Sequence, residues 1–472
     1  MKCERLIKGG KAVIPKVGIQ DVDICIDHGK ITALVSRDSQ IESKDVIDAA
    51  GKYIFPGVVD PHVHWGYSGT ILKEVPGESR AAAIGGCTTV INYPVGYDFH
   101  DRFVPIPNPD DPPSLDDDLG FAVYKEDHEK TSYVDFGFHF KLADEARMRR
   151  ISNLAREMGI TSFKFYMAYT EKEFRRSDIY NKYTDTLLYD SMGVIAKTEK
   201  GICCVHCENS QMLNYFIPKI QNSGEQGLPA WNKARPDFAE AEATNRALFF
   251  AEITGCPTYI VHLTCIRSLD VFSRYRQRGV NIFGEAMTHH LLHSIDSPVG
   301  ILVKNNPPIR TQADCDALWE AVIDGRIDTI ASDCCAARLA DKRGKGDIWT
   351  ASAAYPGPAT NLPLMISEGY HKRGIDLVRI AELTSYNAAV IFHLYPRKGT
   401  IMVGSDADLA IVDLNLEQTV TPELLQGYCD YSIWTGWKVK GWPVMTLLRG
   451  ETLVQNGRLI AKQNRGKYLR RS

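Results

Sequence analysis

Eight short, strongly apolar segments alternate with amphipathic stretches between residues 53 and 398, and this alternation restricts the fold more than any other feature. The amphipathic stretches include DEARMRRISNLAREMG and FAEAEATNRALFFAEITG. Buried strands that alternate with helices are typical of parallel α/β proteins, and eight such units are the number that closes a (β/α)8 barrel. We therefore predict an α/β chain with a TIM-like barrel over residues 53–398. The predicted strands lie in YIFPGVVDPH, TTVINYPV, VDFGFHF, SFKFYMAY, GICCVHCE, TYIVHLT, NIFGEAM and DTIASD.

The two ends of the chain have a different texture. Residues 1–52 and 399–472 alternate apolar and polar side chains around glycine turns, as in DVDICID, GKITALV and GTIMVGSDADLAIVDL. This alternation predicts short antiparallel strands with one solvated face. We expect the two terminal segments to pair into one small β-domain beside the barrel, with a tail after its last strand.

Residues 97–120 interrupt the pattern with a run rich in proline and aspartate, YDFHDRFVPIPNPDDPPSLDDDLG. Such a composition predicts a loop without a core of its own. Because it follows the second predicted barrel strand, it would lie on the face where barrel active sites are found. A solvated surface loop and a lid or subunit contact are both compatible with the sequence.

Charge and cysteine content exclude several classes of protein. The formal net charge of −3 gives no electrostatic reason to expect nucleic acid or an anionic membrane as partner. The first residues lack the apolar stretch of a signal peptide, and no uncharged run approaches the roughly 20 residues that span a bilayer. The 12 cysteines are not spaced as in small secreted domains, which favours free thiols and a cytoplasmic location.

Side chains that bind metals or accept protons occur at the carboxyl ends of the predicted strands. A single histidine is more often structural than a ligand, but here several fall on the same predicted face. In His62 and His64, the two-residue spacing on a strand points both side chains the same way. Imidazole and carboxylate ligands suit two first-row metal ions, and zinc is the first choice. The full candidate set is His62, His64, Lys164, His206, His262 and Asp333.

Lys164 is unusual because it lies inside an apolar strand, where a cationic amine is costly and tends to lose its proton. A neutral amine can add carbon dioxide to form a carbamate, whose two oxygens can bridge two metals. A lysine paired with a buried carboxylate is the alternative. Cys204 and Cys207 flank His206 as a CxxC pair, but a strand directs two such thiols to opposite faces, so we interpret both as packing residues.

The ordered set PGVVDPHVH, FKFYMAY, VHCEN, VHLT, NNPPIR, LYPRKGTIMVGSDADLAIVD and GWPVMTLLRGETLVQNGR covers nearly the whole chain. Through these motifs the chain resembles the dihydropyrimidinase, hydantoinase and allantoinase branch of the amidohydrolase superfamily. The resemblance implies a barrel with a β-sandwich built from both termini. It also implies two zinc ions bridged by a carboxylated lysine and a hydroxide.

The resemblance also assigns roles to individual residues. His62, His64 and Asp333 would hold the more buried metal and His206 and His262 the more exposed one, with carboxylated Lys164 as the bridge. Tyr169 would donate to the developing oxyanion. Asp333 would pass a proton from the hydroxide to the leaving nitrogen, which suits amide hydrolysis because a bound metal lowers the pKa of water from 15.7 toward about 7.

The expected reaction is therefore the opening of a cyclic amide ring of the hydantoin or dihydropyrimidine type. Gly66 stands where the dihydroorotase branch has an arginine, which disfavours a carboxylate-bearing ring. An allantoinase or cyclic-imide hydrolase is the alternative within the family. The alternatives of another class are a non-catalytic dihydropyrimidinase-like scaffold protein of the same fold and a mononuclear deaminase of the same superfamily. We also expect a homo-oligomer, a dimer or a tetramer. The candidate substrate contacts are Trp65 and Tyr67, which suit an apolar substituent, together with Asn306 and Cys334.

Overall fold

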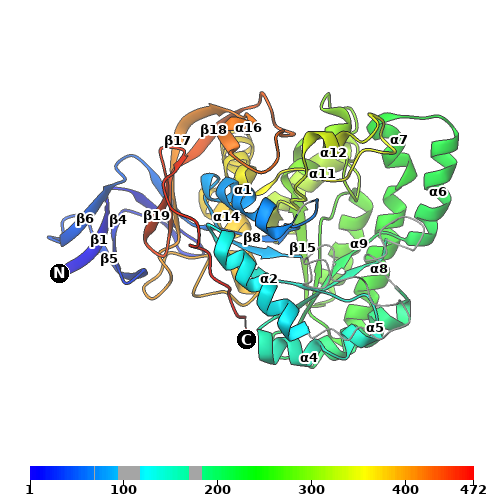
Figure 1. Ribbon diagram of the computed structural model, residues 1–472, viewed down its shortest axis with the longest axis horizontal. Helices are drawn as coiled ribbons and strands as arrows, with labels where there is room; N and C mark the ends of the chain where they lie inside the picture. The colour runs from blue at the N-terminus through cyan, green and yellow to red at the C-terminus, as the bar shows by residue number, and fades with distance from the viewer. Residues whose placement is uncertain (69, 94–116, 169–182, 472) are drawn as a thin grey trace.

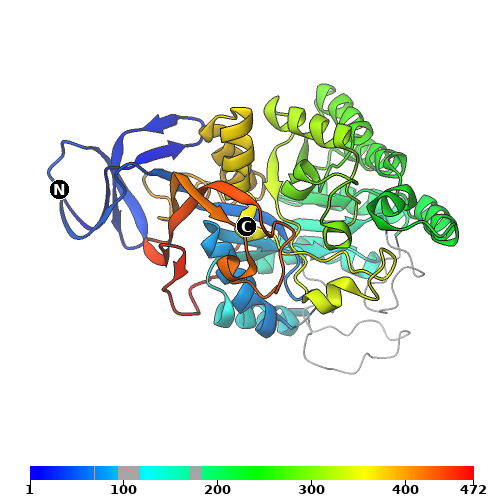
Figure 2. The same cartoon turned by 90° about the horizontal axis from the view of Figure 1, so that it is seen from above.

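The computed structural model describes residues 1–68, 70–93, 117–168 and 183–471. The chain is an α/β protein, as predicted, and the two views of Figures 1 and 2 place the terminal β-strands on one side and helices α6 to α9 on the other. Residues 97–116 of the predicted loop lie outside the described part of the chain. Residues 117–120 do not belong to a loop, because helix α2 begins at Asp117.

Parallel strands follow one another in chain order, and each of the eight predicted apolar segments contains at least one; VDFGFHF holds β10 and the start of β11. They form one sheet in the order β10-β9-β8 and another in the order β11-β12-β13-β14-β15-β16. A parallel bridge between Val63 and Cys334 joins the first strand to the residues after the last. The strands are β8 (Val58–Val63), β9 (Cys87–Asn92), β10 (Asp135–Phe138), β11 (Phe140–Lys141), β12 (Ser162–Tyr166), β13 (Ile202–His206), β14 (Thr258–Ile260), β15 (Ile282–Met287) and β16 (Thr329–Ala331).

Helices follow most of these strands, and the largest buried cluster joins the two layers through residues such as Phe163, Val205 and Leu248. Within the described residues, no helix combines the length and apolar character needed to cross a membrane. The longer helices are α1 (Ile71–Ile84), α2 (Asp117–Thr131), α5 (Asp185–Ala196), α6 (Ser210–Asn222), α7 (Gly227–Ala234), α8 (Asp237–Thr254), α9 (Ile266–Gln277) and α11 (Gln312–Ile323).

Short helical segments complete the layer. The first predicted amphipathic stretch is divided among three of them, whereas the second forms α8 as one helix. The short α-helices are α3 (Glu145–Met148), α4 (Ile151–Asn153), α10 (Thr288–Leu292), α12 (Leu339–Arg343), α13 (Asn361–Leu364), α14 (Leu377–Ala381), α15 (Asn387–Ile391) and α16 (Pro422–Leu425). The π- and 3-10 segments are η1 (Leu154–Met158), η3 (Gly300–Val303), η4 (Pro358–Thr360), η5 (Met365–His371) and η6 (Glu382–Tyr386).

The terminal strands form two sheets, one of which combines both ends of the chain. The four-stranded sheet has the order β5-β4-β1-β6, and the seven-stranded sheet has the order β20-β19-β18-β17-β7-β2-β3. In the second, β17 pairs antiparallel with β7, so that Leu409 lies opposite Pro56. The strands are β1 (Lys2–Lys8), β2 (Lys11–Ile14), β3 (Gly18–Gln20), β4 (Val22–Asp27), β5 (Lys30–Ser36), β6 (Glu42–Asp48), β7 (Tyr53–Pro56), β17 (Leu409–Thr419), β18 (Lys438–Leu448), β19 (Glu451–Gln455) and β20 (Arg458–Leu459).

Gly57 separates the terminal strands from the parallel strands. The apolar segment YIFPGVVDPH holds two strands of different sheets, β7 before this glycine and β8 after it. A Cβ atom at Gly57 would lie 2.2 Å from the Thr88 hydroxyl oxygen, so only glycine allows the chain to pass here. The boundary between the sheets therefore falls a few residues after position 52.

A buried ionic cluster ties the loop before β17 to the parallel strands. The Lys398 ammonium contacts Asp135 and Asp408 at 2.6 Å and Asp406 at 2.9 Å, and Arg449 also pairs with Asp135. Lys398 and the three carboxylates are all buried. Burial alone would disfavour the charged amine, but the carboxylates outweigh it and raise the Lys398 pKa above its usual range. Lys398 belongs to the YPRKG part of the sequence motif, which therefore has a structural role.

We expect Lys398→Met to lower the free energy of unfolding by about 3–5 kcal/mol, because it leaves the buried Asp408 carboxylate without a cationic partner among the described residues. Urea unfolding followed by circular dichroism measures the change. Lys30→Met is the matched control, since Lys30 pairs with the same Asp406 at 2.5 Å but its side chain is 44% exposed; it should cost under about 1 kcal/mol. Equal effects of the two variants would contradict a special role for the buried amine.

Candidate metal centre

Three predicted ligands converge at the carboxyl ends of the first and last parallel strands. His62 lies in β8, His64 directly after it, and Asp333 after β16. Asp333 Oδ1 is 3.0 Å from His62 Nε2 and 3.1 Å from His64 Nε2, and the two Nε2 atoms are 3.1 Å apart. The Val63–Cys334 bridge and a 2.7 Å hydrogen bond from His64 N to Cys334 O align the two segments. This buried His-His-Asp cluster has the geometry of three ligands to one ion.

The charges of this cluster suit metal binding. Burial raises the pKa of a carboxyl group, but the facing His62 and His64 outweigh it and hold the pKa of Asp333 well below its usual range. Asp333 is therefore ionised. Burial lowers the pKa of His64 to about 4, so its imidazole is neutral and has a lone pair to offer.

Glu285 of β15 orients His62 from behind. Its Oε2 lies 2.7 Å from His62 Nδ1 and accepts a 3.0 Å hydrogen bond from His262 N, while Oε1 accepts one from the Tyr259 hydroxyl at 2.7 Å. A carboxylate on one imidazole nitrogen fixes the tautomer and directs the other nitrogen at the ligand. Glu285 thus directs His62 Nε2 toward Asp333 and at the same time holds the backbone of a second candidate ligand.

His206 and His262 form the other half of the candidate centre. His206 ends β13 and His262 follows β14, with ring centroids 4.5 Å apart, and the His262 ring is 5.7 Å from that of His62. Glu208 Oε2 lies 2.8 Å from His206 Nε2 and is itself paired with Arg235 at 2.6 Å. Burial opposes ionisation of Glu208, but Arg235 outweighs it and lowers the pKa of that carboxyl to about 2. The Glu208 carboxylate therefore holds the His206 proton on Nε2, so Nδ1 presents the lone pair.

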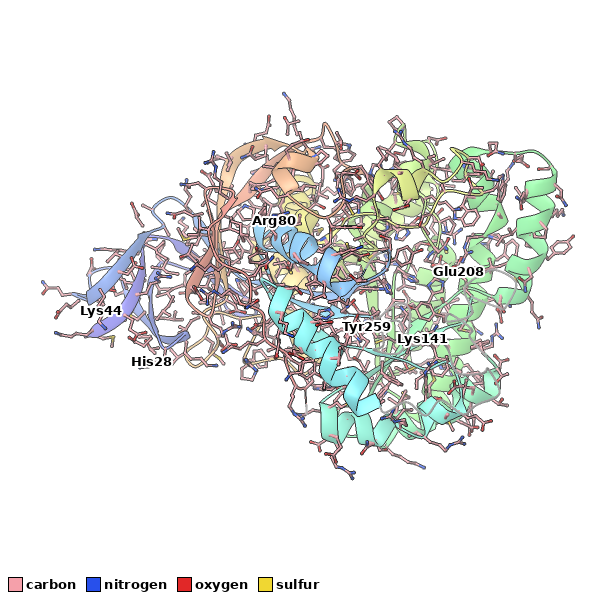
Figure 3. All side chains as sticks on the ribbon, viewed as in Figure 1. His28, Lys44, Arg80, Lys141, Glu208 and Tyr259 are labelled. Atoms are coloured by element: carbon pink, nitrogen blue, oxygen red, sulfur yellow. The ribbon has the colours of Figure 1, made fainter. Side chains whose placement is uncertain are left out.

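We expect Glu208→Gln to weaken metal binding at His206 and His262 by about 10- to 100-fold, the usual effect of losing a carboxylate behind a ligand histidine. Titration of the metal-free protein with zinc, read by calorimetry, would show one site weakened and one unchanged. Glu208 lies on the side of the molecule away from the terminal strands (Figure 3). Glu242→Gln is the control, because Glu242 makes a comparable 3.0 Å pair with Arg246 at the surface. Two unchanged sites in Glu208→Gln would contradict the role of this carboxylate.

Lys164 lies in β12, one strand before His206, and is 1% exposed. Its Nζ atom has no hydrogen-bond partner among the described residues and lies 4.5 Å from the Tyr93 ring centroid and 5.0 Å from that of Tyr166. Burial lowers the Lys164 pKa to about 8, which makes the neutral amine accessible. The alternative prediction, a pair with a buried carboxylate, is not found in the described part of the chain. A buried amine without a partner is costly unless another group completes it.

The backbone at two candidate ligands adopts the left-handed region. The φ angle is +40° at His262 and +49° at Asp333. Residues with a side chain rarely adopt this region, at a cost of about 1–3 kcal/mol each, and such strain concentrates at functional sites. The surrounding contacts therefore hold His262 and Asp333 in a backbone conformation that such residues rarely adopt.

Tyr355 contacts the oxygen of Asp333 that faces away from the histidines. Its hydroxyl donates a 3.0 Å hydrogen bond to Asp333 Oδ2. Cys335 and Tyr355 form an antiparallel bridge, with hydrogen bonds in both directions between their backbones. The loop after β16 therefore folds back so that its phenol fixes the second carboxylate oxygen.

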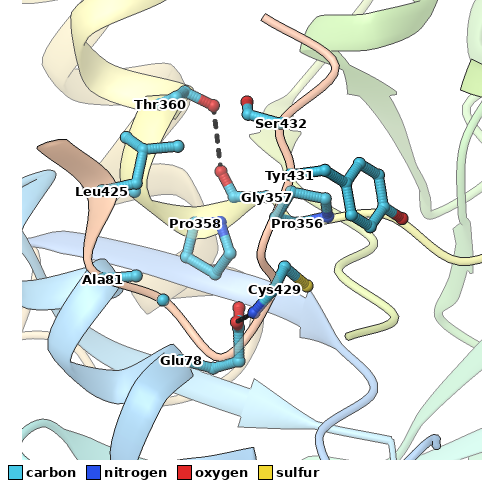
Figure 4. A pocket seen from close by; sticks show the side chains of 12 residues that line it. Glu78, Ala81, Pro356, Gly357, Pro358, Thr360, Leu425, Cys429, Tyr431 and Ser432 are labelled. Carbon is cyan, nitrogen blue, oxygen red and sulfur yellow. Dashed lines mark hydrogen bonds between the residues drawn. The ribbon is translucent and has the colours of Figure 1, made fainter. Parts of the chain in front are cut away.

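A pocket lies behind this loop, between α1 and residues 425–432 (Figure 4). Glu78 of α1 accepts backbone hydrogen bonds from Tyr428 and Cys429 at 2.9 and 3.3 Å, which tie the two walls together. The loop side is formed by Pro356, Gly357, Pro358, Ala359 and Thr360. No predicted metal ligand is among the residues that line this pocket.

The other predicted contacts fall into different environments. Tyr169 lies outside the described residues. Trp65 is fully buried in the main core with Val75 and Tyr124, whereas Tyr67 is partly exposed. Asn306 is partly exposed, and the Cys334 thiol donates to Glu78 Oε2 at 3.3 Å.

The cysteines are free thiols, as predicted. Cys204 of β13 and Cys207, directly after this strand, belong to two different buried clusters, in agreement with the prediction that they pack on opposite sides. Sequence reasoning did not single out Glu285, Glu208 or Tyr355. A carboxylate inside the apolar segment NIFGEAM was a usable signal for Glu285, and Glu208 lay within the VHCEN motif.

The chain was compared with known protein families and sequences. Residues 53–453 match the family described as "Amidohydrolase family". The chain is 31% identical to D-hydantoinase of Geobacillus stearothermophilus, over 99% of this chain and 96% of that protein. It is also 31% identical to an allantoinase of Desulfitobacterium hafniense (strain Y51), with 98% of each covered.

Solved structures give the same result. The structure of L-hydantoinase (dihydropyrimidinase) from Arthrobacter aurescens superposes with a TM-score of 0.89 at 27% sequence identity, and covers 99% of this chain and 100% of that chain. A match of this extent means that the two chains share the same overall fold.

Proposed function

The chain belongs to the amidohydrolase family, and from this membership and the geometry of the centre we propose the reaction it catalyses. It is a metal-dependent hydrolase that opens the ring of a cyclic amide, of the hydantoin or dihydropyrimidine type. One observation carries the proposal. Ligand atoms of His62, His64 and Asp333 all lie within 4.8 Å of one another, close enough to bind one ion, and the Lys164 amine is buried. Relatives named D-hydantoinase, L-hydantoinase and allantoinase support the class of substrate.

We infer that the two parallel sheets form the wall of one (β/α)8 barrel over residues 53–398. Only His139 separates β10 from β11, and the Val63–Cys334 bridge lies where the wall would close. The shared seven-stranded sheet supports a β-sandwich domain built from residues 1–52 and 399–472 together with β7 (Tyr53–Pro56), which joins the two segments. The metal centre then occupies the carboxyl ends of the strands, where barrel enzymes carry their active sites.

Two zinc ions bridged by carboxylated Lys164 complete the proposal. The residues present fit this group, because the buried amine has no described hydrogen-bond partner and its lowered pKa of about 8 leaves a neutral fraction that can take up carbon dioxide. His62, His64 and Asp333 would hold one ion, and His206 with His262 the other. When bound, the ions supply a nucleophilic water at neutral pH and polarise the amide carbonyl.

The chain's own residues move the proton and stabilise charge. Asp333 is ionised, so it can accept a proton from the attacking water and return it to the ring nitrogen as the carbon–nitrogen bond breaks. Tyr355 holds Oδ2 of that carboxylate in place. Tyr169, five residues after Lys164 in the sequence, is our predicted hydrogen-bond donor to the oxyanion.

We propose that residues after the first parallel strand and in the loop after β15 determine which ring substituent is accepted. Tyr67 and Asn306 keep exposed surface that a substrate can contact, and Cys334 follows Asp333. Trp65 is buried in the core and would not contact the substrate directly. Any effect of Trp65 on substrate binding would come through the position of the following residues, Gly66 and Tyr67. We also propose a homo-oligomer, a dimer or a tetramer, and a cytoplasmic location.

A substrate panel tests the proposed function. Purified protein reconstituted with zinc is offered dihydropyrimidines, both enantiomers of 5-substituted hydantoins, allantoin and cyclic imides, and ring opening is followed by loss of amide absorbance. We expect the fastest turnover with a 5-substituted hydantoin or a dihydropyrimidine. Fastest turnover of allantoin or an imide would select the alternative within the family. No bound ion and no turnover of any ring would favour the non-catalytic scaffold, and a single ion would favour the mononuclear deaminase.

A further inference from the structure

Residues 465–471 leave the terminal strands and run beside the parallel strands. Tyr468 forms a parallel bridge with Phe136 of β10, flanked by hydrogen bonds from Phe136 N to Lys467 O at 3.1 Å and from Leu469 N to Phe136 O at 2.8 Å. The Leu469 side chain is fully buried in a cluster with residues of β8, β9, β13 and β14. In Figure 1 this end of the chain reaches the side of α2 and α4. The segment is therefore an integral part of the core around the parallel strands.

Arg471 directs its guanidinium into this core. The residue is 1% exposed, and its Nη1 donates a 2.7 Å hydrogen bond to the Ser162 hydroxyl while Nη2 donates to the Phe138 carbonyl. Its backbone N donates to Gly159 O at 3.1 Å. Among the described residues Arg471 makes no ion pair, and the contacts described there for its guanidinium are these hydrogen bonds. A buried arginine stabilised in this way is costly, which points to a specific role.

A directional chain of hydrogen bonds leads from Arg471 toward the metal centre. The Ser162 hydroxyl lies 2.6 Å from His139 Nδ1, and His139 Nε2 lies 2.9 Å from the Pro61 carbonyl oxygen. A carbonyl only accepts, so Nε2 carries the proton and Nδ1 must accept from Ser162. Ser162 in turn accepts from Arg471, and its hydroxyl has a single orientation. Pro61 directly precedes His62 in β8.

A second contact leads from His139 to the same centre. Its ring stacks on Tyr93 with centroids 3.8 Å apart and an angle of 10°. Tyr93 in turn lies 4.6 Å from the His62 ring, and the Lys164 amine is 4.5 Å from the Tyr93 centroid. His139 therefore contacts both Pro61, the residue before His62, and Tyr93, whose ring lies beside His62 and Lys164.

We propose that Arg471 is a positioning residue of the metal centre. Through Ser162 it holds the plane of the His139 ring, and through His139 it holds Pro61 and Tyr93 in place beside His62 and Lys164. This inference rests on the proposed function, since it concerns the same centre. It assigns a role in the active site to a residue far from the candidate ligands in the sequence, on a segment that crosses from the terminal strands to the parallel ones.

The test measures metal retention and turnover separately. Arg471→Met keeps the apolar stem of the side chain and removes its guanidinium donors, and Ser162→Ala breaks the chain of hydrogen bonds one step later. We expect each to speed the loss of zinc to a chelator and to lower kcat, both by about 10- to 100-fold, with KM within about twofold of the unaltered protein. The double variant should be no worse than either single one, because both remove the same link. Arg470→Met is the matched control, since Arg470 is exposed and donates only to the Glu157 and Arg156 carbonyls among its described contacts.

Added guanidinium distinguishes positioning from general stability. With Arg471→Ala, millimolar guanidinium should restore metal retention, and it should leave Ser162→Ala unchanged. Thermal unfolding identifies any variant that fails to fold. If Arg471→Ala fails to fold, the comparison uses Ser162→Ala and Arg471→Met instead. Folded variants that retain zinc like the unaltered protein, or effects that add in the double variant, would overturn the proposal. If the unaltered protein opens no ring, the proposed function fails, while the metal-retention comparison still decides the role of Arg471.

Discussion

Lys164→Ala is expected to lose both metals and ring-opening activity together. The amine is buried and has no described hydrogen-bond partner, so its replacement removes the only group at this position that can become an anionic bridge. The loss of activity should exceed the roughly 10- to 100-fold that follows when a residue behind a ligand is lost. Metal per chain, measured by mass spectrometry after dialysis, and turnover of the best ring substrate check the two parts.

Adding a short carboxylic acid to Lys164→Ala tests whether the missing group is an anionic bridge. Alanine leaves a space where the side chain and its carbamate would lie, and acetate or propionate can place two oxygens there. Partial return of metal and activity with added acid is therefore expected. Lys141→Ala is the matched control, because Lys141 lies opposite Lys164 in the pairing of β11 with β12 but is partly exposed. A Lys164→Ala protein with two ions and full activity would exclude the carbamate.

Asp333→Asn is expected to retain at least one metal and to lose amide hydrolysis by about 10²- to 10⁴-fold, the usual contribution of a positioned acid–base group. Asparagine keeps an oxygen toward His62 and His64 but cannot accept a proton. An ester in place of the ring amide separates the two roles of the residue. Because an alkoxide leaves without the help that an amine nitrogen needs, the variant should be less impaired on the ester.

Tyr355→Phe is the matched control for Asp333, since it removes the hydrogen bond to Oδ2 and leaves the carboxylate in place. We expect a smaller loss than with Asp333→Asn, with amide and ester affected alike. Equal impairment of Asp333→Asn on amide and ester would restrict that residue to holding metal. Near-normal amide turnover would exclude it from proton transfer.

The parallel strands and the histidines could be predicted because each depends on local sequence. An apolar run of four to eight residues between polar stretches is almost sufficient to define a buried strand, and strands of one direction bring their carboxyl ends together. The sequence therefore placed His206 and His262 on the same face, and in the structure their ring centroids lie 4.5 Å apart. Glu285 could have been found by the argument used for Lys164, since both are charged residues in apolar strands.

Residues in loops could not be predicted in the same way, because a loop follows its backbone angles and has no periodic pattern. Gly66 adopts a φ of +93°, and a Cβ there would lie 2.8 Å from Ile71. This turn directs Trp65 into the core and leaves Tyr67 partly exposed, a difference that their two-residue spacing concealed. Tyr355 reaches Asp333 only because the loop after β16 folds back on itself, and nothing in ASAAYPGPATNL indicates that return.

The sheet shared by both ends of the chain has a consequence for biosynthesis. β7 emerges from the ribosome early, but its neighbour β17 is synthesised only after the whole region of parallel strands. At about 5–20 residues per second, β7 waits on the order of 20 to 70 seconds for this partner. During that interval its outer edge carries unpaired backbone groups that can join another chain. Slower translation or early termination before residue 409 should therefore increase aggregation, whereas release of the complete chain closes the edge.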